Sequence, residues 1–249
     1  MKKILFLLAT QLLVINLWSQ EAAIKEANEA YSNEEYGKAA ELYQAVLQEH
    51  GESANIYYNL GNCYYKMNRI APAILNYERA LLLDPGNSNI RFNLEMSYLK
   101  TVDKIETVGH FFVEDWATAI RNLYATNQWS YIGIVCFLLF IICLVLFFFS
   151  RKIILKKVGF YAGIALLILT ITSNTFSYKQ KEKLVTRNTA IVFAPTVTIK
   201  SSPSASGNDL FLLHEGTKVT IKTRLGSWYE METADGHIGW ISEEDIEVI

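Results

Sequence analysis

The longest uncharged segment limits the architecture of this chain more than any other feature. From Asn122 to Ser150 the sequence contains no Asp, Glu, Lys or Arg, and a second uncharged segment runs from Val158 to Tyr178. A helix rises about 1.5 Å per residue, so each segment is long enough to cross a hydrocarbon layer of about 30 Å. We therefore predict transmembrane helices over residues 130–150 and 158–178. For the second segment, whose end is polar, an interfacial helix is the alternative.

The charges around these segments predict the topology. Residues 151–157 carry four positive charges and no acidic residue, which places this loop in the cytoplasm by the positive-inside rule. Residues 1–19 combine two Lys with an apolar run and the small Ser19, as in a cleaved signal peptide, with an uncleaved anchor as the alternative. Both features place the two soluble domains, before and after the spans, on the outer side of the membrane. Residues 107–129, rich in aromatic side chains, are predicted to form an amphipathic segment at the outer interface.

The composition excludes several classes of protein. Residues 21–120 carry 15 acidic and 8 basic side chains, residues 179–249 carry 10 and 8, and the formal net charge of the chain is −2. This balance does not fit a protein that binds nucleic acid through a basic surface. The chain has 3 Cys, of which two lie in the first predicted span, so we expect no structural disulfide.

A repeat with a period of 34 residues precedes the first span. A shift of 34 superimposes ten pairs of residues: Asn28/Asn62, Tyr31/Tyr65, Ala39/Ala73, Tyr43/Tyr77, Leu47/Leu81, Asn55/Asn89, Ile56/Ile90, Asn59/Asn93, Leu60/Leu94 and Tyr64/Tyr98. This period and residue pattern are those of the tetratricopeptide repeat, an α-solenoid of antiparallel helix pairs. We predict repeats over residues 20–53 and 54–87 and a capping helix over 88–106. Small residues such as Gly61 would let the helices approach closely.

Stacked tetratricopeptide repeats present a groove lined by the first helix of each pair. By position in the repeat, nine residues are candidates for a protein-binding groove: Asn28, Tyr31, Asn55, Tyr58, Asn62, Tyr65, Lys66, Asn89 and Phe92. Ile24 and Tyr58 stand where repeats of the carboxylate-binding type have basic residues, which argues against capture of a peptide C-terminus. The alternative is that the Tyr residues only pack within the solenoid.

The segment after the second span predicts a small all-β domain. Short β-branched and aromatic runs alternate with turn-forming residues, and Asp235-Gly236 indicates a hairpin turn. About five strands in this length would form a compact barrel. The series VTIKSSPS, LFLLHEGTKVTI, GSWYEM and DGHIGWI resembles a bacterial SH3-like domain over residues 188–249. Its candidate ligand face is Trp228, Tyr229 and Trp240, with burial of both Trp residues in the barrel core as the alternative.

Residues for catalysis do not form a recognisable pattern. The four His residues (His50, His110, His214 and His237) are scattered, and no helix carries two of them at metal-binding spacing. No Cys lies near a His partner outside the repeats and the spans. We therefore predict a protein that is not an enzyme and that uses no metal or cofactor.

The order of the segments resembles one family. A signal peptide, a short tetratricopeptide array, the linker IRFNLEMSYLKTVDKIE, two spans and an SH3-like domain are similar to the BatE family of the bacterial aerotolerance (Bat) operon. The resemblance implies a bacterial inner-membrane protein with both outer domains in the periplasm. It also implies von Willebrand A-domain membrane proteins as partners and a role in tolerance of oxygen or envelope stress.

From these observations we expect an adaptor with two protein-binding domains on one membrane anchor, because linked sites raise each other's effective concentration. Besides partner proteins and membrane lipid, peptidoglycan is a candidate ligand. Two alternatives remain: a cell-wall sensor that binds peptidoglycan peptides through the SH3-like domain, and a structural scaffold without a ligand.

Overall fold

A computed structural model describes residues 20–104 and 112–249. The predicted signal peptide and the first residues of the predicted interfacial segment lie outside these residues. The described chain forms two compact units. One unit contains the repeat region and the C-terminal strands, and the other contains the apolar helices between them.

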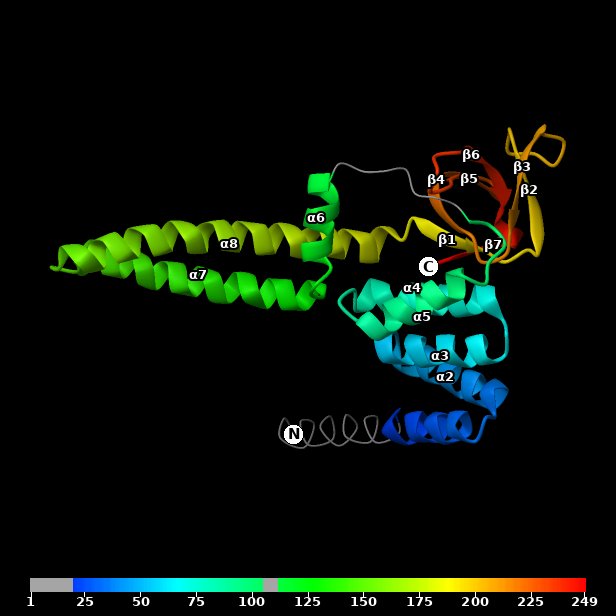
Figure 1. The fold of residues 1–249 in the computed structure, drawn as a ribbon, viewed down its shortest axis with the longest axis horizontal. Coiled ribbons are helices and arrows are strands. Elements are labelled where there is room, and N and C mark those ends of the chain that lie inside the picture. The colour runs from blue at the N-terminus through cyan, green and yellow to red at the C-terminus, as the bar shows by residue number, and fades with distance from the viewer. Residues whose placement is uncertain (1–19, 105–111) are drawn as a thin grey trace, which may run out of the picture. The chain divides into compact units, whose positions relative to one another are not determined.

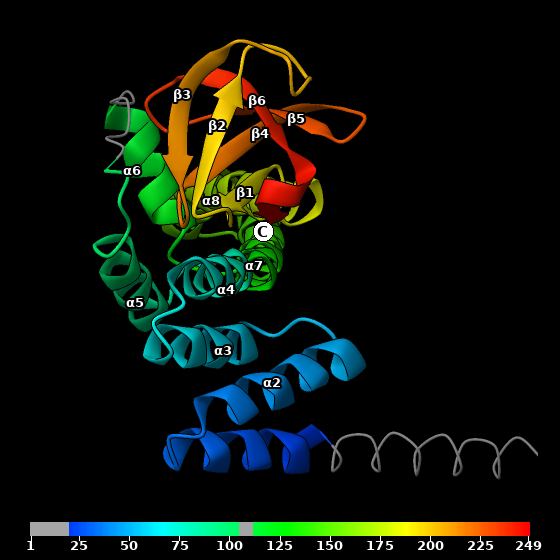
Figure 2. The same cartoon turned by 90° about the vertical axis from the view of Figure 1, so that its right-hand side faces the viewer.

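The repeat region is a stack of antiparallel helices (Figure 2). Residues 20–32 are helical, followed by α2 (Tyr36–His50), α3 (Ala54–Lys66), α4 (Ile70–Leu83) and α5 (Ser88–Tyr98). The turn inside each pair has the same backbone, since Glu34 (φ 64°) and Asn68 (φ 59°) both adopt the left-handed conformation, 34 positions apart. The helical repeat predicted from the sequence is therefore present.

Small residues allow the helices to pack closely. Ala27 and Ala73 are fully buried between helices. A Cβ atom at Gly61 of α3 would lie 2.7 Å from the ring of Tyr77 on α4, which is closer than packed atoms can approach. The packing role predicted for these small residues is confirmed.

The C-terminal region is one antiparallel sheet of seven strands. The strands are β1 (Thr189–Val192), β2 (Thr196–Lys200), β3 (Asp209–His214), β4 (Lys218–Leu225), β5 (Trp228–Glu232), β6 (Ile238–Ser242) and β7 (Ile246–Val248). Their order is β3-β2-β6-β5-β4-β1-β7. The edge strands β3 and β7 do not pair with each other, so the sheet is not closed by hydrogen bonds as the predicted barrel would be. The predicted number of about five strands is also lower than the seven observed, because β1 and β7 are very short.

The turn predicted at Asp235-Gly236 joins β5 to β6, and Gly236 has φ +88°. Behind the sheet lies an aliphatic core whose fully buried members include Ile199, Met231 and Ile241. Neither Trp228 nor Trp240 belongs to this core, so the alternative that the two Trp residues fill it is wrong.

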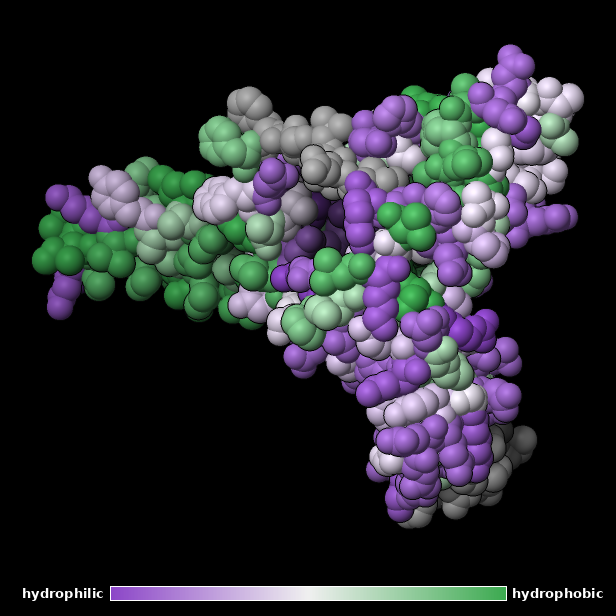
Figure 3. All heavy atoms as spheres, turned by 45° about the vertical axis from the view of Figure 1, so that its right-hand side comes forward, coloured by the Kyte–Doolittle hydropathy of each residue, from purple (hydrophilic) through white to green (hydrophobic). Residues whose placement is uncertain are grey.

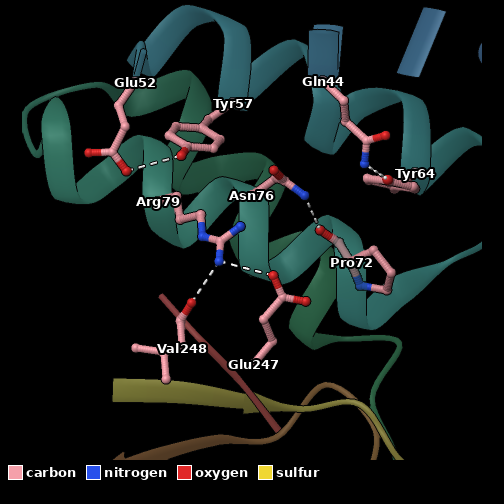
Figure 4. A network of polar contacts seen from close by, with 9 residues as sticks. All are labelled: Gln44, Glu52, Tyr57, Tyr64, Pro72, Asn76, Arg79, Glu247 and Val248. Atoms are coloured by element: carbon pink, nitrogen blue, oxygen red, sulfur yellow. Dashed lines mark hydrogen bonds and ion pairs between the residues drawn. The ribbon is translucent and has the colours of Figure 1, made fainter. Parts of the chain in front are cut away.

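The sheet and the repeats share a second core. Ile191 of β1 and Ile249 are buried in the same cluster as the helical residues, and Phe193 packs against that cluster. Three polar links accompany this contact: Arg79 with Glu247, Glu78 with Lys218, and Asp103 with His214 (Figure 4 shows the first). The repeats and the sheet are therefore one packed body, a contact that the sequence did not predict.

The other unit contains α6 (Phe112–Arg121), α7 (Thr126–Phe149) and α8 (Ile153–Thr186) (Figure 1). The last two are long and apolar enough to cross a membrane by length and composition. Hydrophobic side chains cover the visible face of this hairpin (Figure 3). The two helices approach closely where Gly159 faces the carbonyl of Cys143, as small residues allow in membrane helix pairs.

The boundaries in this unit differ from the prediction. Residues 126–129 extend α7 rather than the interfacial segment, and α8 begins within the predicted loop of residues 151–157. α7 stays within its uncharged segment, whereas α8 continues past its own at both ends, because charged and polar residues are compatible with a helix once it leaves an apolar environment. Amphipathic α6 exposes Phe112 and Trp116.

Candidate functional site

Three helices of the repeat region build a groove of about 360 Å³. The helix of residues 20–32, α3 and α5 are the first helices of their pairs and therefore face the same side of the stack. Six of the nine predicted groove residues line this one hollow: Tyr31, Tyr58, Asn62, Tyr65, Lys66 and Phe92. We call this hollow the Tyr/Asn groove.

The other three predicted residues lie outside it. Asn28 lines a separate shallow hollow with Lys25 and Glu29. Asn55 and Asn89 are exposed in the first turn of α3 and of α5, at a different height along the helices. The position of a residue in the repeat identifies the correct helix face, but it does not specify how far along the helix the groove extends.

Three lining residues were missed by the sequence reasoning: Tyr77, Asn93 and Met96. The spacing of a helix pointed to two of them. Asn93 lies four residues after Asn89, and Met96 lies four residues after Phe92, on the same helix face as these predicted groove residues. Tyr77 was expected only to pack, and it does so while its hydroxyl also reaches the groove.

A hydrogen-bond network holds the groove amides in place. Tyr77 Oη donates to Asn62 Oδ1 over 2.7 Å, and Asn93 Nδ2 donates to the same oxygen over 2.9 Å. Asn93 Nδ2 also donates to Tyr58 Oη over 3.1 Å. Because Asn62 Oδ1 accepts two bonds, the amide is fixed with Nδ2 as its remaining donor. The groove thus presents an oriented amide donor among aromatic rings.

The same contact occurs in the first repeat. Tyr43 Oη donates to Asn28 Oδ1 over 2.6 Å, and both partners lie 34 positions before Tyr77 and Asn62. Asn28 is therefore a structural equivalent of Asn62, but no third helix extends the groove over it in the described chain.

Electrostatics make the groove neutral inside and positive at its rim. Burial raises the pKa of Tyr77 above its ordinary value of 10.0, and burial likewise raises the pKa of Tyr31. Both phenols stay protonated and can donate. At the rim, Lys100 Nζ lies 4.0 Å from the centre of the Tyr65 ring. Neither Lys66 nor Lys100 forms an ion pair with any residue that the structure describes.

Apolar side chains at the groove are exposed to solvent. Phe92 is 61% exposed and Met96 is 38% exposed, although both lie on a helix that buries its opposite face. Exposure of such side chains beside polar groups is typical of a protein-binding surface.

The carboxylate-binding pair of the family has no counterpart here. Tyr58 lines the groove, and Ile24 packs against the helical core rather than offering a charge. The structure places no basic residue at these two positions.

The candidate ligand face of the sheet is divided between two sides. Trp228 pairs with Ser242 and Trp240 pairs with Glu230, so both Trp side chains point to the same face of the β5–β6 pair. Tyr229 pairs with Ile241 and packs against the aliphatic core on the opposite face. Its hydroxyl donates to Glu243 Oε1 over 3.3 Å. Only Trp228 and Trp240 form a shared outer surface.

The described residues contain no group of three His, Cys, Asp or Glu placed to hold a metal ion. Cys63 is fully buried in the repeats, and burial raises the pKa of its thiol to about 12. This cysteine is therefore a packed apolar residue and not a reactive thiolate.

The comparisons with known proteins concern the repeat region. The family model described as "Tetratricopeptide repeat" matches residues 54–87. A peroxisomal targeting signal receptor from Yarrowia lipolytica is 33% identical over 79 residues, which are 32% of this chain and 13% of the receptor. The chain thus matches only a small part of that relative.

Among solved structures, the type III secretion chaperone SycD of Yersinia enterocolitica, in complex with a peptide of the translocator YopD, has a TM-score of 0.31 and 14% identity. The match covers 61% of this chain and 92% of the chaperone. The family model and the helix pairs together show that this chain contains a tetratricopeptide repeat.

Proposed function

We propose that this protein is a non-enzymatic adaptor whose Tyr/Asn groove binds an extended segment of a partner protein. The observation that carries the proposal is the groove itself, in which an oriented Asn62 donor lies beside exposed Phe92 and Met96. An amide donor suits a backbone carbonyl, and the aromatic and thioether groups suit an apolar side chain.

The charges at the rim of the groove narrow the expected chemistry of the ligand. Lys66 and Lys100 favour a segment that carries an acidic residue beside its apolar anchor. The similarity to a peroxisomal targeting signal receptor is consistent with such a role, since that protein is named as a receptor for a targeting signal.

We further propose that α7 and α8 anchor the adaptor in the inner membrane of a bacterium, with the repeats and the sheet in the periplasm. The support is the length and apolar surface of both helices, together with the basic residues between them. The order of segments supports a BatE-like protein with an SH3-like C-terminal domain. Its partners would then be von Willebrand A-domain membrane proteins, acting in aerotolerance or envelope stress.

Purification of the tagged full chain from native membranes in mild detergent tests the proposal. Phe92→Ala should remove a bound von Willebrand A-domain protein, because it removes the exposed anchor of the groove. Leu99→Ala is the matched control: Leu99 is 69% exposed, follows directly after α5 and does not line the groove. Equal recovery of the partner with both variants would refute groove binding.

A second candidate is a cell-wall sensor. It is favoured by the shared outer surface of the half-buried Trp228 and Trp240, since aromatic faces at a surface suit sugar rings and peptides. Binding of purified wall fragments that Trp240→Ala abolishes and Phe92→Ala leaves intact would support the sensor over the adaptor.

A further inference from the structure

α3 carries a second set of aromatic residues on the side that faces away from the groove. Tyr57 and Tyr64 directly precede Tyr58 and Tyr65, and they line a cavity of about 490 Å³. The cavity is bounded by α2, α3 and α4 and by Phe193 and Glu247 of the C-terminal region (Figure 4). We call it the junction pocket, because both the repeats and the sheet contribute to it.

The apolar part of the junction pocket is preformed. Leu60 and Leu75 are each 3% exposed, and Tyr57 and Tyr64 are each 8% exposed. Tyr57 is further held by a hydrogen bond to Glu52 Oε1. A ligand that buries an apolar side chain here does not need to reorganise these side chains.

Two guanidinium groups lie at this pocket, and only one of them is neutralised. Arg79 Nη2 donates to Glu247 Oε1 over 3.0 Å and to the carbonyl of Val248 over 2.7 Å. Arg69 has its Cζ atom 5.0 Å from the centre of the Tyr64 ring and forms no ion pair within the described residues. The ring positions the Arg69 charge without cancelling it. Among the residues that line the pocket, Arg69 and Arg79 carry two positive charges and Glu247 one negative charge, so the lining has a net charge of +1.

Amide groups complete the site. Asn76 is only 4% exposed, and its Nδ2 donates to the carbonyl of Pro72 over 2.8 Å. Its Oδ1 points the other way and accepts no hydrogen bond from any described residue (Figure 4). Gln44 Nε2 donates to Tyr64 Oη over 2.7 Å, which leaves its carbonyl oxygen as a second acceptor. These two acceptors match the N–H groups of a peptide backbone.

The repeat pattern accounts for Tyr57 and Tyr64, which stand at two of its aromatic packing positions, but not for the cationic and amide groups of this pocket. The first repeat has acidic or apolar residues at the positions of Arg69, Asn76 and Arg79, namely Glu35, Leu42 and Ala45. The repeat fold therefore does not require these polar groups. Of the two repeats, only the one that the sheet contacts carries them.

We propose that the junction pocket is a second peptide-binding site, which takes an acidic side chain and a neighbouring apolar side chain of a partner protein. The carboxylate pairs with the Arg69 guanidinium, and the apolar side chain lies on Leu60 and Leu75. A single carboxylate fits the single uncompensated charge, whereas a phosphate group carries about −1.5 to −2. This site is independent of the Tyr/Asn groove, so failure of one does not imply failure of the other.

Titration of the detergent-solubilised full chain with a capped pentapeptide of sequence Ala-Leu-Glu-Leu-Ala tests the proposal. The same peptide with Gln in place of Glu is the control ligand. We expect the Glu peptide to bind about tenfold more tightly, because a hydrogen-bonded charge pair adds to affinity. Arg69→Ala should remove this preference, and Arg69→Lys should restore only part of it, since Lys lacks the stacked planar fork.

Lys38→Ala, at an exposed cation of α2 that lines neither the groove nor the junction pocket, is the matched control variant and should leave the preference unchanged. Arg69 is exposed, so its replacement leaves the fold intact. The proposal is wrong if the two peptides bind equally, or if Arg69→Ala keeps the preference. It is also wrong if Lys38→Ala removes the preference as well, or if inorganic phosphate displaces the Glu peptide at concentrations equal to that of the peptide.

Discussion

The two sides of α3 differ in how they relate to the repeat. On the groove side, Asn62 binds Tyr77 just as Asn28 binds Tyr43, so the contacts recur with the period of the sequence. On the junction side, Arg69, Asn76 and Arg79 replace Glu35, Leu42 and Ala45, and their contacts occur once. The period of a repeat thus encodes its internal framework, whereas the departures from the period mark where another part of the chain, or a partner, binds.

Ile191→Ala should cause the largest loss in the free energy of unfolding. Ile191 of β1 is fully buried in the core shared with the repeats, so its truncation should cost about 2–5 kcal/mol. Denaturant unfolding should then show the repeats and the sheet melting in separate transitions. Ile199→Ala, in the core of the sheet alone, is the control and should not split the repeats from an intact sheet. Unfolding of Ile191→Ala in one transition at the midpoint of the wild type would contradict a role of Ile191 in a shared core.

Removal of the Asp103 carboxylate should cause the next largest loss of stability, on the junction side. Its oxygens accept from the backbone N–H of His214 over 2.7 Å, from Thr217 Oγ1 over 2.7 Å and from the His214 ring over 2.8 Å. Asp103→Ala leaves these groups without that partner and should cost about 1–3 kcal/mol, as measured by chemical denaturation.

The same carboxylate predicts a dependence on pH. Burial alone would raise the pKa of Asp103, but the hydrogen bonds from His214 and Thr217 outweigh it and lower the pKa below 3.8. A lowered folded-state pKa gives stability that is present above the unfolded value and is lost as the pH falls through the folded value. Stability of the wild type should therefore decrease more steeply below pH 3.8 than that of Asp103→Asn. Parallel curves for the two proteins would show that Asp103 contributes nothing.

On the groove side, two equivalent substitutions should have equal effects on stability. Tyr77→Phe and Tyr43→Phe each remove one phenol–amide hydrogen bond and should each cost about 0.5–1.5 kcal/mol. Only Tyr77→Phe should also weaken partner binding, because it releases the Asn62 amide within the groove. Thermal unfolding and partner capture measured on both variants check this difference. Equal loss of binding in both would mean that the network has no positioning role.

The smallest effect should come from Glu247→Gln. The side chain of Glu247 is 50% exposed, so its ion pair with Arg79 is worth about 0–1 kcal/mol. The substitution should change the charge of the junction pocket more than the stability, since the Arg79 guanidinium would also become uncompensated. The Ala-Leu-Glu-Leu-Ala peptide should then bind more tightly, and unchanged binding would exclude Arg79 from the site.

The sequence predicts those parts of the molecule whose residues recur at a regular spacing. It yields the helix pairs, the small residues at Ala73 and Gly61, and six of the nine residues on the groove face, since burial of one helix face repeats every turn. It fails at Asn28, Asn55 and Asn89, because the extent of a groove depends on which helices are adjacent.

Contacts between distant segments leave no such pattern. Ile191 and Ile249 read as ordinary strand residues, and nothing in their spacing shows that they pack on helices more than a hundred residues earlier in the chain. Tyr229 was grouped with Trp228 and Trp240 although neighbouring residues of a strand point to opposite faces. The open sheet likewise depends on edge pairing, which short strands such as β7 do not reveal.

Photo-crosslinking at position 92 in native membranes tests the central claim most directly. A benzoylphenylalanine residue in place of Phe92 puts the reactive group inside the Tyr/Asn groove, and the same residue in place of Leu99 puts it on exposed surface outside the groove. The adaptor proposal predicts a discrete crosslinked partner protein from position 92 and none from position 99. Absence of a product at position 92, or the same products from both positions, would contradict it.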